Sequence, residues 1–386
     1  MRAARRQRRT DAQRGLTVRI AFLSWRDTTH PDGGGSEVFV EAVGRELVLR
    51  GHAVTLLCSR HPGSAPRDDL DGIRLRRLGG RLTVYLWGLA WLVWHRRDVD
   101  VVVDVVNGLP FASPLVRRKG VVALVHHVHA EQWRIIYPGL AGRIGWFVES
   151  RIVPLLYRGR PFLTVSDASA RDLVAIGVDA ARITVVRNGL VAVPAEVVEE
   201  SPLPRLAVLS RLVPHKQIEH ALTVVHRLSA EFPDLHLDVV GDGWWHDELA
   251  TAAEALDVTD RVTFHGHVSD ARRDQLVGEA WLMVMPSIKE GWCLAITESG
   301  AQGTPSVAYA EAGGVTESIR DGVTGRLAAD LDDLVGIVRE LLTDHTTRSR
   351  MGVAARRMAR TLTWDTCAVR AEVVLRAAGA PNDQSP

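Results

Sequence analysis

The sequence is short of cysteine, of long apolar runs and of an excess of charge of either sign. Its three cysteines are an odd number without metal-binding spacing, which argues against a disulfide framework or a zinc motif: Cys58, Cys293 and Cys367. They suit a reducing compartment, with each thiol buried as a small apolar group. No apolar run is long enough to span a bilayer. The net charge of +1 gives no overall attraction to polyanions, so we expect no nucleic-acid partner.

The ends of the chain predict tails rather than targeting segments. Residues 1–15 are basic but lack the apolar stretch of a secretory signal, so we interpret them as a disordered tail. That tail is either inert or in contact with anionic lipid. A second disordered tail is expected over 379–386. These features favour a cytoplasmic protein, with peripheral contact at the inner face of the plasma membrane as an open alternative.

The most informative stretch lies between two apolar runs, Trp281–Pro286 and Pro305–Tyr309, each typical of a buried parallel strand. There is room between them for one loop and one helix. If the helix begins near residue 293 or 294, Glu290 lies in the loop before it and Glu298 lies one to two turns inside it. The first backbone N–H groups of such a helix form an anion site, here flanked by two carboxylates.

A carboxylate beside an anion site is explained by a ligand that carries both phosphate and hydroxyl groups. A nucleotide-sugar presents hydroxyls on both sides of its diphosphate, and each hydroxyl can donate to a carboxylate. Two solvated glutamates on an ordinary strand–helix unit are the alternative for an isolated pair with this spacing. The residues around the pair decide between the two interpretations.

Residues 289–305 read Lys-Glu-Gly-Trp-Cys-Leu-Ala-Ile-Thr-Glu-Ser-Gly-Ala-Gln-Gly-Thr-Pro, which resembles the E-x7-E signature of retaining GT-B glycosyltransferases of family four. The resemblance implies an α/β fold with two Rossmann-like, doubly wound domains that face each other across a cleft. It also implies transfer of a sugar with retention of anomeric configuration, from a UDP- or GDP-linked donor, without a metal or other cofactor. The acceptor is not indicated, and cell-envelope molecules, including lipid-linked ones, are candidates.

The same resemblance divides the chain. We expect a first, acceptor-side domain over 16–190, a proline-rich linker over 191–204 and a nucleotide-sugar-binding domain over 205–363. A helix over about 364–378 is expected to cross back onto the first domain.

In the second domain, Arg211 and Lys216 follow a predicted strand, where two cations can hold a diphosphate. The surrounding residues resemble the diphosphate clamp of the family, whereas a solvated surface pair is the alternative. Gly241 resembles the turn beneath the nucleotide. The resemblance also assigns donor contacts to Glu298 and to the start of the signature helix: Gly291, Trp292, Cys293 and Leu294.

In the first domain, a glycine run opens a helix predicted over 38–50. A dinucleotide-binding loop would need the spacing G-x-G-x-x-G and an acid about 20 residues later, and both are missing. The resemblance instead places the backbone of Gly34 and Gly35 against the donor diphosphate.

Three histidines, His126, His127 and His129, follow the predicted strand Val121–Val125. A metal site is disfavoured, because neighbouring side chains on a strand alternate in direction and no acidic or cysteine cluster lies nearby. The resemblance places one histidine at the donor sugar. The strand register favours His126, with the other two as second choices that face the acceptor.

Residues 80–97 contain three tryptophans and end in two arginines. They predict an amphipathic helix that packs in the core or rests on a membrane surface, and core packing is the simpler interpretation. Two rival functions share the expected fold. One is a nucleotide-sugar epimerase, although no carboxylates are arranged for proton abstraction in the first domain; the other is an inactive homologue that only binds the donor.

Overall fold

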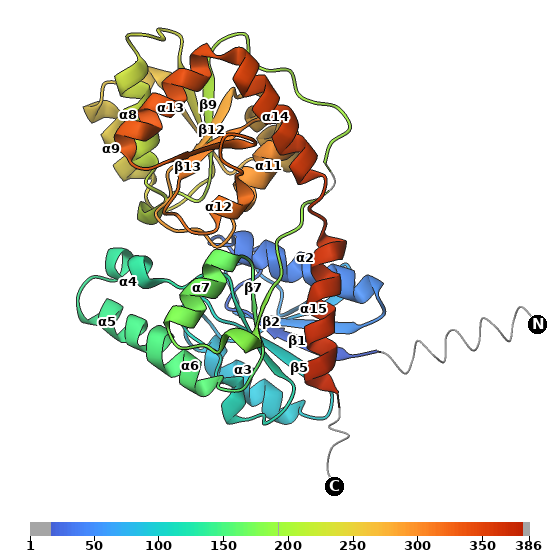
Figure 1. Ribbon diagram of the computed structural model, residues 1–386. Helices are drawn as coiled ribbons and strands as arrows, with labels where there is room; N and C mark the ends of the chain where they lie inside the picture. Colours follow the sequence, from blue (N-terminus) through green and yellow to red (C-terminus); the bar gives the residue numbers. More distant parts are fainter. Residues whose placement is uncertain (1–16, 192, 381–386) are drawn as a thin grey trace, which may run out of the picture.

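The computed structural model describes residues 17–191 and 193–380. The predicted tail over 1–15 and residues 381–386 lie outside the described residues. Two α/β units are stacked one above the other, each built around its own sheet (Figure 1). The GT-B arrangement predicted from the sequence is therefore confirmed. The described residues contain no helix that is long and apolar enough to cross a bilayer.

The first sheet has eight strands in the order β3-β4-β2-β1-β5-β6-β7-β8. All neighbours are parallel except β3 and β4, which form an antiparallel hairpin at one edge. The strands are β1 (Arg19–Leu23), β2 (Ala53–Cys58), β3 (Arg67–Leu70), β4 (Ile73–Arg77), β5 (Val101–Val105), β6 (Val121–Val125), β7 (Phe162–Thr164) and β8 (Ile183–Val185). Strands β5 and β6 are buried along their whole length, as expected for central parallel strands covered on both faces.

Helices cover both faces of this sheet. They are α2 (Gly35–Leu49), α3 (Val84–Trp94), η1 (Ser113–Leu115), α4 (Ala130–Ile136), α5 (Leu140–Phe147), the π-helical turn η2 (Val148–Ile152), α6 (Val153–Leu156), α7 (Asp167–Ala175) and η3 (Ala180–Arg182). One apolar core lies beneath α2, and a second lies beneath α3 and α6 on the opposite face.

The second sheet has six parallel strands in the order β11-β10-β9-β12-β13-β14. They are β9 (Arg205–Leu209), β10 (His236–Val240), β11 (Val262–Gly266), β12 (Leu282–Met285), β13 (Ser306–Tyr309) and β14 (Gly325–Ala328). The connecting helices are η4 (Pro214–Lys216), α8 (Ile218–Leu228), α9 (His246–Ala255), η5 (Thr259–Arg261), α10 (Asp270–Glu279), α11 (Leu294–Gln302), α12 (Val315–Ser318), α13 (Leu331–Thr343) and α14 (His345–Ala359). One continuous core fills this domain.

The last helix, α15 (Trp364–Gly379), leaves the second domain and packs on the first (Figure 1). Four of its five buried residues belong to the core beneath α2: Trp364, Cys367, Ala371 and Leu375. The two segments that connect the domains touch, because the N–H of Leu190 donates to the carbonyl of Leu362 at 3.1 Å.

Two local predictions need correction, and one element was not predicted. The helix after the glycine run begins at Gly35 rather than Val38, because glycine is accommodated in the first turn, and it ends at Leu49. The last helix includes Gly379, which was assigned to the disordered tail. The hairpin of β3 and β4 was not predicted, since its strands are rich in arginine and aspartate and lack an apolar run.

Candidate active site

The predicted site residues come from loops that follow the carboxyl ends of parallel strands. Arg211 follows β9, Glu290 follows β12 and His126 follows β6. In an open parallel α/β sheet the ligand crevice lies at this end of the strands. The two domains turn these ends toward each other, so the loops meet at the domain interface.

Arg211 reaches from the second domain to the glycine run of the first. Its Nη1 donates to the backbone carbonyl of Asp32 at 3.2 Å. A Cβ atom on Gly34 would lie 3.3 Å from Nε of Arg211, so glycine permits this close approach. Burial lowers the pKa of Arg211, and the positive charge of Arg26 acts in the same direction. Even a lowered arginine pKa leaves the guanidinium charged at neutral pH.

Two helix amino termini converge beside this arginine. A Cβ atom on Gly35, the first residue of α2, would lie 3.4 Å from Cδ1 of Leu294, the first residue of α11. Cys293, which precedes α11, makes no side-chain hydrogen bond that caps the helix. The N–H of Gly34 donates to Oε2 of Glu37 at 2.8 Å. Because amino termini carry partial positive charge, the junction of α2 and α11 attracts anions.

Lys216 and Glu290 form an ion pair in the second domain, with 2.5 Å between Nζ and Oε1. Lys216 ends η4, and Glu290 stands in the loop before α11, as predicted. Both side chains are mostly buried, with 15% and 11% of the side-chain surface exposed. The lysine therefore lies beside the predicted anion site with its charge balanced by the first glutamate.

Glu298 lies in the second turn of α11, also as predicted. Burial raises its pKa, and the positive charge of Arg273 on α10 opposes that shift. The negative charges of Asp274 and Asp270, also on α10, raise the pKa of Glu298 further. The structure thus gives the two glutamates different surroundings: Glu290 pairs with a lysine, whereas Glu298 is desolvated and faces an arginine.

The loop between the two glutamates enters the first domain. A Cβ atom on Gly291 would lie 2.4 Å from the carbonyl oxygen of His126, and one on Gly314 would lie 1.9 Å from the carbonyl oxygen of Gly291. Only glycine therefore fits at both positions. Trp292 is buried in the core beneath α2, although it belongs to the second domain. This insertion brings the signature loop against the carboxyl end of β6.

His126 is buried against Phe39, with 5.2 Å between the ring centroids in an edge-on arrangement. Neither ring nitrogen has a hydrogen-bond partner among the described residues. Burial, with a smaller contribution from His129, lowers the pKa of His126 to about 3. The imidazole is therefore neutral at physiological pH and retains an unused donor and an unused acceptor.

The other two histidines have partners. Nε2 of His127 lies 3.0 Å from Oε1 of Gln132, and Nδ1 of His129 lies 2.8 Å from Oε1 of Glu149. The two rings lie 4.2 Å apart. Burial, followed by the charges of His129 and His215, lowers the pKa of His127. Within residues 17–191 and 193–380, no three histidine, cysteine or acidic side chains are grouped so that they could hold a metal ion.

Backbone constraints explain two further predicted positions. Gly241 has φ +127°, and a Cβ atom there would lie 1.9 Å from the carbonyl oxygen of Ser210, next to Arg211. Cys293 adopts the left-handed conformation, with φ 70°, which is costly for a residue with a side chain. Burial raises the pKa of its thiol, so Cys293 stays protonated.

Three residues at the interface were missed by the sequence analysis. Arg26 pairs with Glu37 at 3.2 Å, and both side chains are buried beside Arg211. His215 lies next to Lys216, and its pKa is lowered to about 3, mainly by burial and then by the charge of Lys216. Arg26 could have been predicted as a site residue, because it stands shortly after a buried strand, as Arg211 does.

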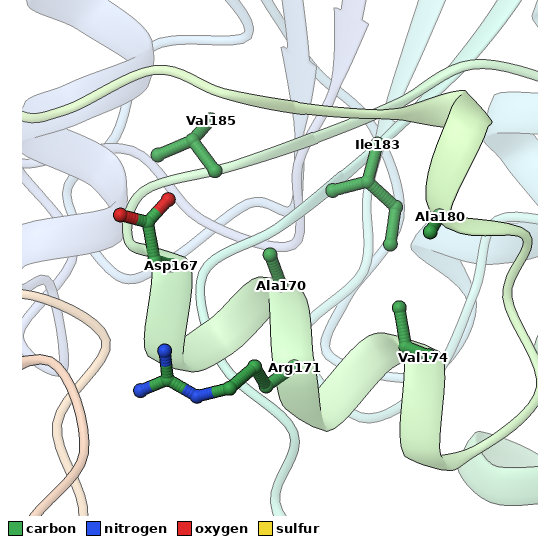
Figure 2. A pocket seen from close by; sticks show the side chains of 7 residues that line it. All are labelled: Asp167, Ala170, Arg171, Val174, Ala180, Ile183 and Val185. Carbon is green, nitrogen blue, oxygen red and sulfur yellow. The ribbon is translucent and has the colours of Figure 1, made fainter.

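A separate hollow of about 370 Å³ lies between α7 and β8, away from these residues (Figure 2). Five of its seven lining residues are aliphatic, with Asp167 and Arg171 at its rim. It has no contact with the signature loop and is not part of the candidate site.

Comparison with known proteins places this geometry in a family. Residues 194–358 match the family model described as glycosyl transferases group 1, and residues 33–192 match that of glycosyltransferase family 4. The chain is 30% identical to the MMP α-(1→4)-mannosyltransferase of Mycolicibacterium hassiacum, over 92% of this chain and 97% of the relative. The chain belongs to the glycosyltransferases, with a family 4 domain followed by a group 1 domain.

A second relative of this glycosyltransferase is a GDP-mannose-dependent α-(1-6)-phosphatidylinositol monomannoside mannosyltransferase of Mycolicibacterium smegmatis. It is 27% identical over 85% of this chain and 91% of the relative.

Solved structures of similar proteins have the same fold. A sucrose-phosphate synthase from Thermosynechococcus elongatus superposes with a TM-score of 0.79 at 17% identity, covering 93% of this chain and 98% of the other. The Anabaena protein HepE, solved in complex with UDP-glucose, superposes with a TM-score of 0.72 at 18% identity, covering 92% and 99%.

Proposed function

We propose that this glycosyltransferase moves a hexosyl group from a UDP- or GDP-linked donor to an acceptor hydroxyl, with retention of anomeric configuration. The observation that carries the proposal is the convergence of the α2 and α11 amino termini with Arg211 and Lys216. Departure of a nucleoside diphosphate builds negative charge, and preorganised positive groups stabilise that charge best. In this proposal these groups do the work that a divalent metal does elsewhere.

Donor binding would rearrange the ion pair of Lys216 and Glu290. A phosphate oxygen can replace the carboxylate as the partner of Lys216, which lies beside the amino terminus of α11. Glu290 can then accept hydrogen bonds from the donor sugar, and Glu298 from the ribose. The two unpartnered ring nitrogens of buried His126 provide a further place for a sugar hydroxyl.

Neither glutamate is assigned the role of a nucleophile, so we favour attack from the face of the leaving group. The acceptor oxygen forms a bond to the anomeric carbon as the bond to the phosphate oxygen breaks. The acceptor proton passes to that phosphate oxygen, which balances the reaction without an additional base. A covalent sugar–enzyme adduct, detected by mass spectrometry of the intact protein, would contradict this route.

Cell-envelope glycolipid synthesis is the setting that the named relatives support, because one of them acts on a phosphatidylinositol mannoside. The nucleotide base of the donor is either uracil or guanine in this proposal. The same relative is GDP-mannose-dependent, whereas HepE was solved with UDP-glucose. Donor binding decides between them.

The first experiment is thermal unfolding of the purified protein with UDP, GDP, ADP and their common sugars. One nucleotide series should raise the unfolding temperature, and Lys216→Ala should abolish the shift. Lys119→Ala is the matched control, because Lys119 is exposed in the first domain. Removal of one such preorganised cation should also slow transfer by about 10²–10³.

Three outcomes would count against the proposal. If no nucleotide stabilises the folded protein, the donor-binding role fails. If a nucleotide-sugar is converted to its epimer without any acceptor, the chain is an epimerase. Nuclear magnetic resonance of the product gives the anomeric configuration, and inversion would contradict retention.

A further inference from the structure

Helix α3 is apolar on all sides and yet half of it faces solvent. Its eleven residues contain no charged side chain. Leu86 and Trp94 are each 70% exposed, and Trp87 and Val93 are about half exposed. A helix that is apolar all round is normally buried. The sequence analysis favoured packing of this helix in the core. The structure shows such packing on one side only, where Val84, Gly88 and Leu92 are buried.

A second apolar stripe lies on the same face of the first sheet. Leu140, Ile144 and Phe147 follow one another at helical spacing along α5, and each is more than half exposed. The stripe continues through Ile152 and Leu155. The inner sides of α3 and of the α5–α6 segment pack on one shared core, with Val84 and Val153 among its members.

The two stripes form one outer surface, and we refer to residues 81–97 and 133–160 together as the α3–α6 surface. Its helices lie along one side of the first domain, away from α2 and α15 (Figure 1). Arg81, before α3, donates to the hydroxyl of Tyr137, after α4, at 2.7 Å, which joins the two segments.

The charge on this surface is mainly positive, although the exposed acids Asp98 and Glu131 lie at its edges. Its two segments contain eight arginines and one acidic residue, Glu149. That glutamate is buried and accepts hydrogen bonds from His129 and Trp133, so it contributes nothing to the outer surface. Because the whole chain has a net charge of +1, the remainder is net acidic. Positive charge is therefore concentrated around the exposed apolar side chains.

We propose that the α3–α6 surface docks this glycosyltransferase on an anionic lipid bilayer. Exposed Trp, Phe and Leu side chains flanked by arginine are the composition of an interfacial membrane-binding face. Anionic headgroups attract the arginines, and the apolar stripes enter the boundary between headgroups and acyl chains. A second copy of the chain is a poorer partner for this surface, because pairing two such surfaces would bring arginines of like charge together.

The surface reaches the edge of the candidate active site. Helix α4 contacts η4, which ends at Lys216. The guanidinium of Arg81 lies 5.3 Å from the ring of Trp25, in the loop after β1. A bilayer held on this surface would bring lipid-linked hydroxyls to the domain interface. The presentation of lipid-linked acceptors to the active site rests on the proposed function, whereas docking of the surface on a bilayer does not.

The test is co-sedimentation of the full chain with two kinds of vesicle, pure phosphatidylcholine and phosphatidylcholine with phosphatidylglycerol. We expect binding to the anionic vesicles that weakens with added salt. The triple variant Leu140→Ser/Ile144→Ser/Phe147→Ser should reduce the partition coefficient by about tenfold or more, because three apolar side chains no longer enter the bilayer interface. Arg143→Gln and Arg151→Gln should each reduce it by about fivefold.

Matched controls alter the same residue types elsewhere. Val353→Ser/Val373→Ser removes apolar side chains that are 70% and 65% exposed on α14 and α15, and Arg370→Gln removes an exposed charge on α15. These variants should bind vesicles as the wild type does. Equal losses in variants and controls, or no vesicle binding by the folded wild type, would overturn the proposal.

Two further measurements separate the possible failures. Light scattering without vesicles reports the oligomeric state, and a dimer that dissociates in the triple variant would assign the surface to a second copy instead. Nucleotide stabilisation is measured on the same samples. Intact donor binding without vesicle binding refutes the membrane surface alone, and vesicle binding without donor binding refutes the proposed function alone.

Discussion

Several buried histidines at the domain interface carry no charge. The pKa values of His126 and His215 are lowered to about 3, and burial is the main cause in both. Neutral imidazoles can donate and accept hydrogen bonds at once, which suits recognition of sugar hydroxyls. The same burial makes the folded state sensitive to acid.

The expected pH dependence follows from proton linkage. Below pH 6.5 the unfolded chain protonates these imidazoles and the folded chain does not, so the free energy of unfolding falls as the pH drops toward 3. Each histidine should contribute up to about 1.4 kcal/mol per pH unit in this window. Asp104 acts in the opposite direction, because burial raises its pKa to about 6.

Chemical denaturation at pH 5 and pH 7 isolates the contribution of one side chain. His126→Gln should unfold with a smaller difference between the two pH values than the wild type. His267→Gln, which alters an exposed histidine, should retain the full difference. If the two variants behave alike, His126 is not the acid-sensitive group.

At the scale of elements, the signature loop fits between α11 and the first domain only because it contains glycine. The Cβ atom of alanine at Gly291 would overlap the carbonyl oxygen of His126, which is backbone and cannot rotate away. The loop would have to withdraw, and Trp292 would leave the first-domain core with it. The contact between the signature loop and the first domain thus depends on Gly291 having no side chain.

Gly291→Ala should therefore weaken the domain contact while each domain stays folded. We expect faster amide hydrogen exchange around His126 and a loss of transfer rate of about a hundredfold, the cost of displacing a catalytic group by about 1 Å. Gly336→Ala is the control, because no atom lies within 4 Å of the added Cβ in α13. It should leave exchange unchanged and stabilise by ~0.5–1 kcal/mol. Unchanged exchange in Gly291→Ala would refute the steric argument.

The elements that were predictable carry local signals. Buried parallel strands such as β6 and β12 are short apolar runs, and α11 begins at the residue expected from the signature. The ion pair of Lys216 and Glu290 was not predictable, since the residues come from loops after different strands. Exposure of α3 was not predictable either, because an apolar sequence does not say which side remains uncovered.

At the scale of the whole molecule, the two domains are joined by ion pairs as well as by the signature loop. Arg187 pairs with Glu317 of α12 at 2.9 Å and with Asp167 of α7 at 2.6 Å. Lys289 pairs with Asp172 at 2.7 Å. Arg187 stands in the turn that closes the first domain, so charge couples that turn to the second domain.

Exchanging the charges tests this coupling. Arg187→Glu should favour separated domains, seen as a larger radius of gyration in small-angle X-ray scattering, because it faces two carboxylates. Partly exposed pairs contribute about 1 kcal/mol or less, so the shift in population should be about fivefold or smaller. Adding Glu317→Arg should restore the compact form in part. Arg171→Glu, at the rim of the hollow in Figure 2, is the control and should not change the radius.

Helix α15 has a consequence for how the protein is made. The first sheet leaves the ribosome long before Trp364 and Leu375, which complete one of its cores. During that interval the apolar face over β5 and β6 has no cover from α15. By the time Trp364 is made, the second domain already has all of its strands. The domain that is translated first is therefore the last to be finished, and nascent chains should hold a chaperone-binding surface on it until synthesis nears its end.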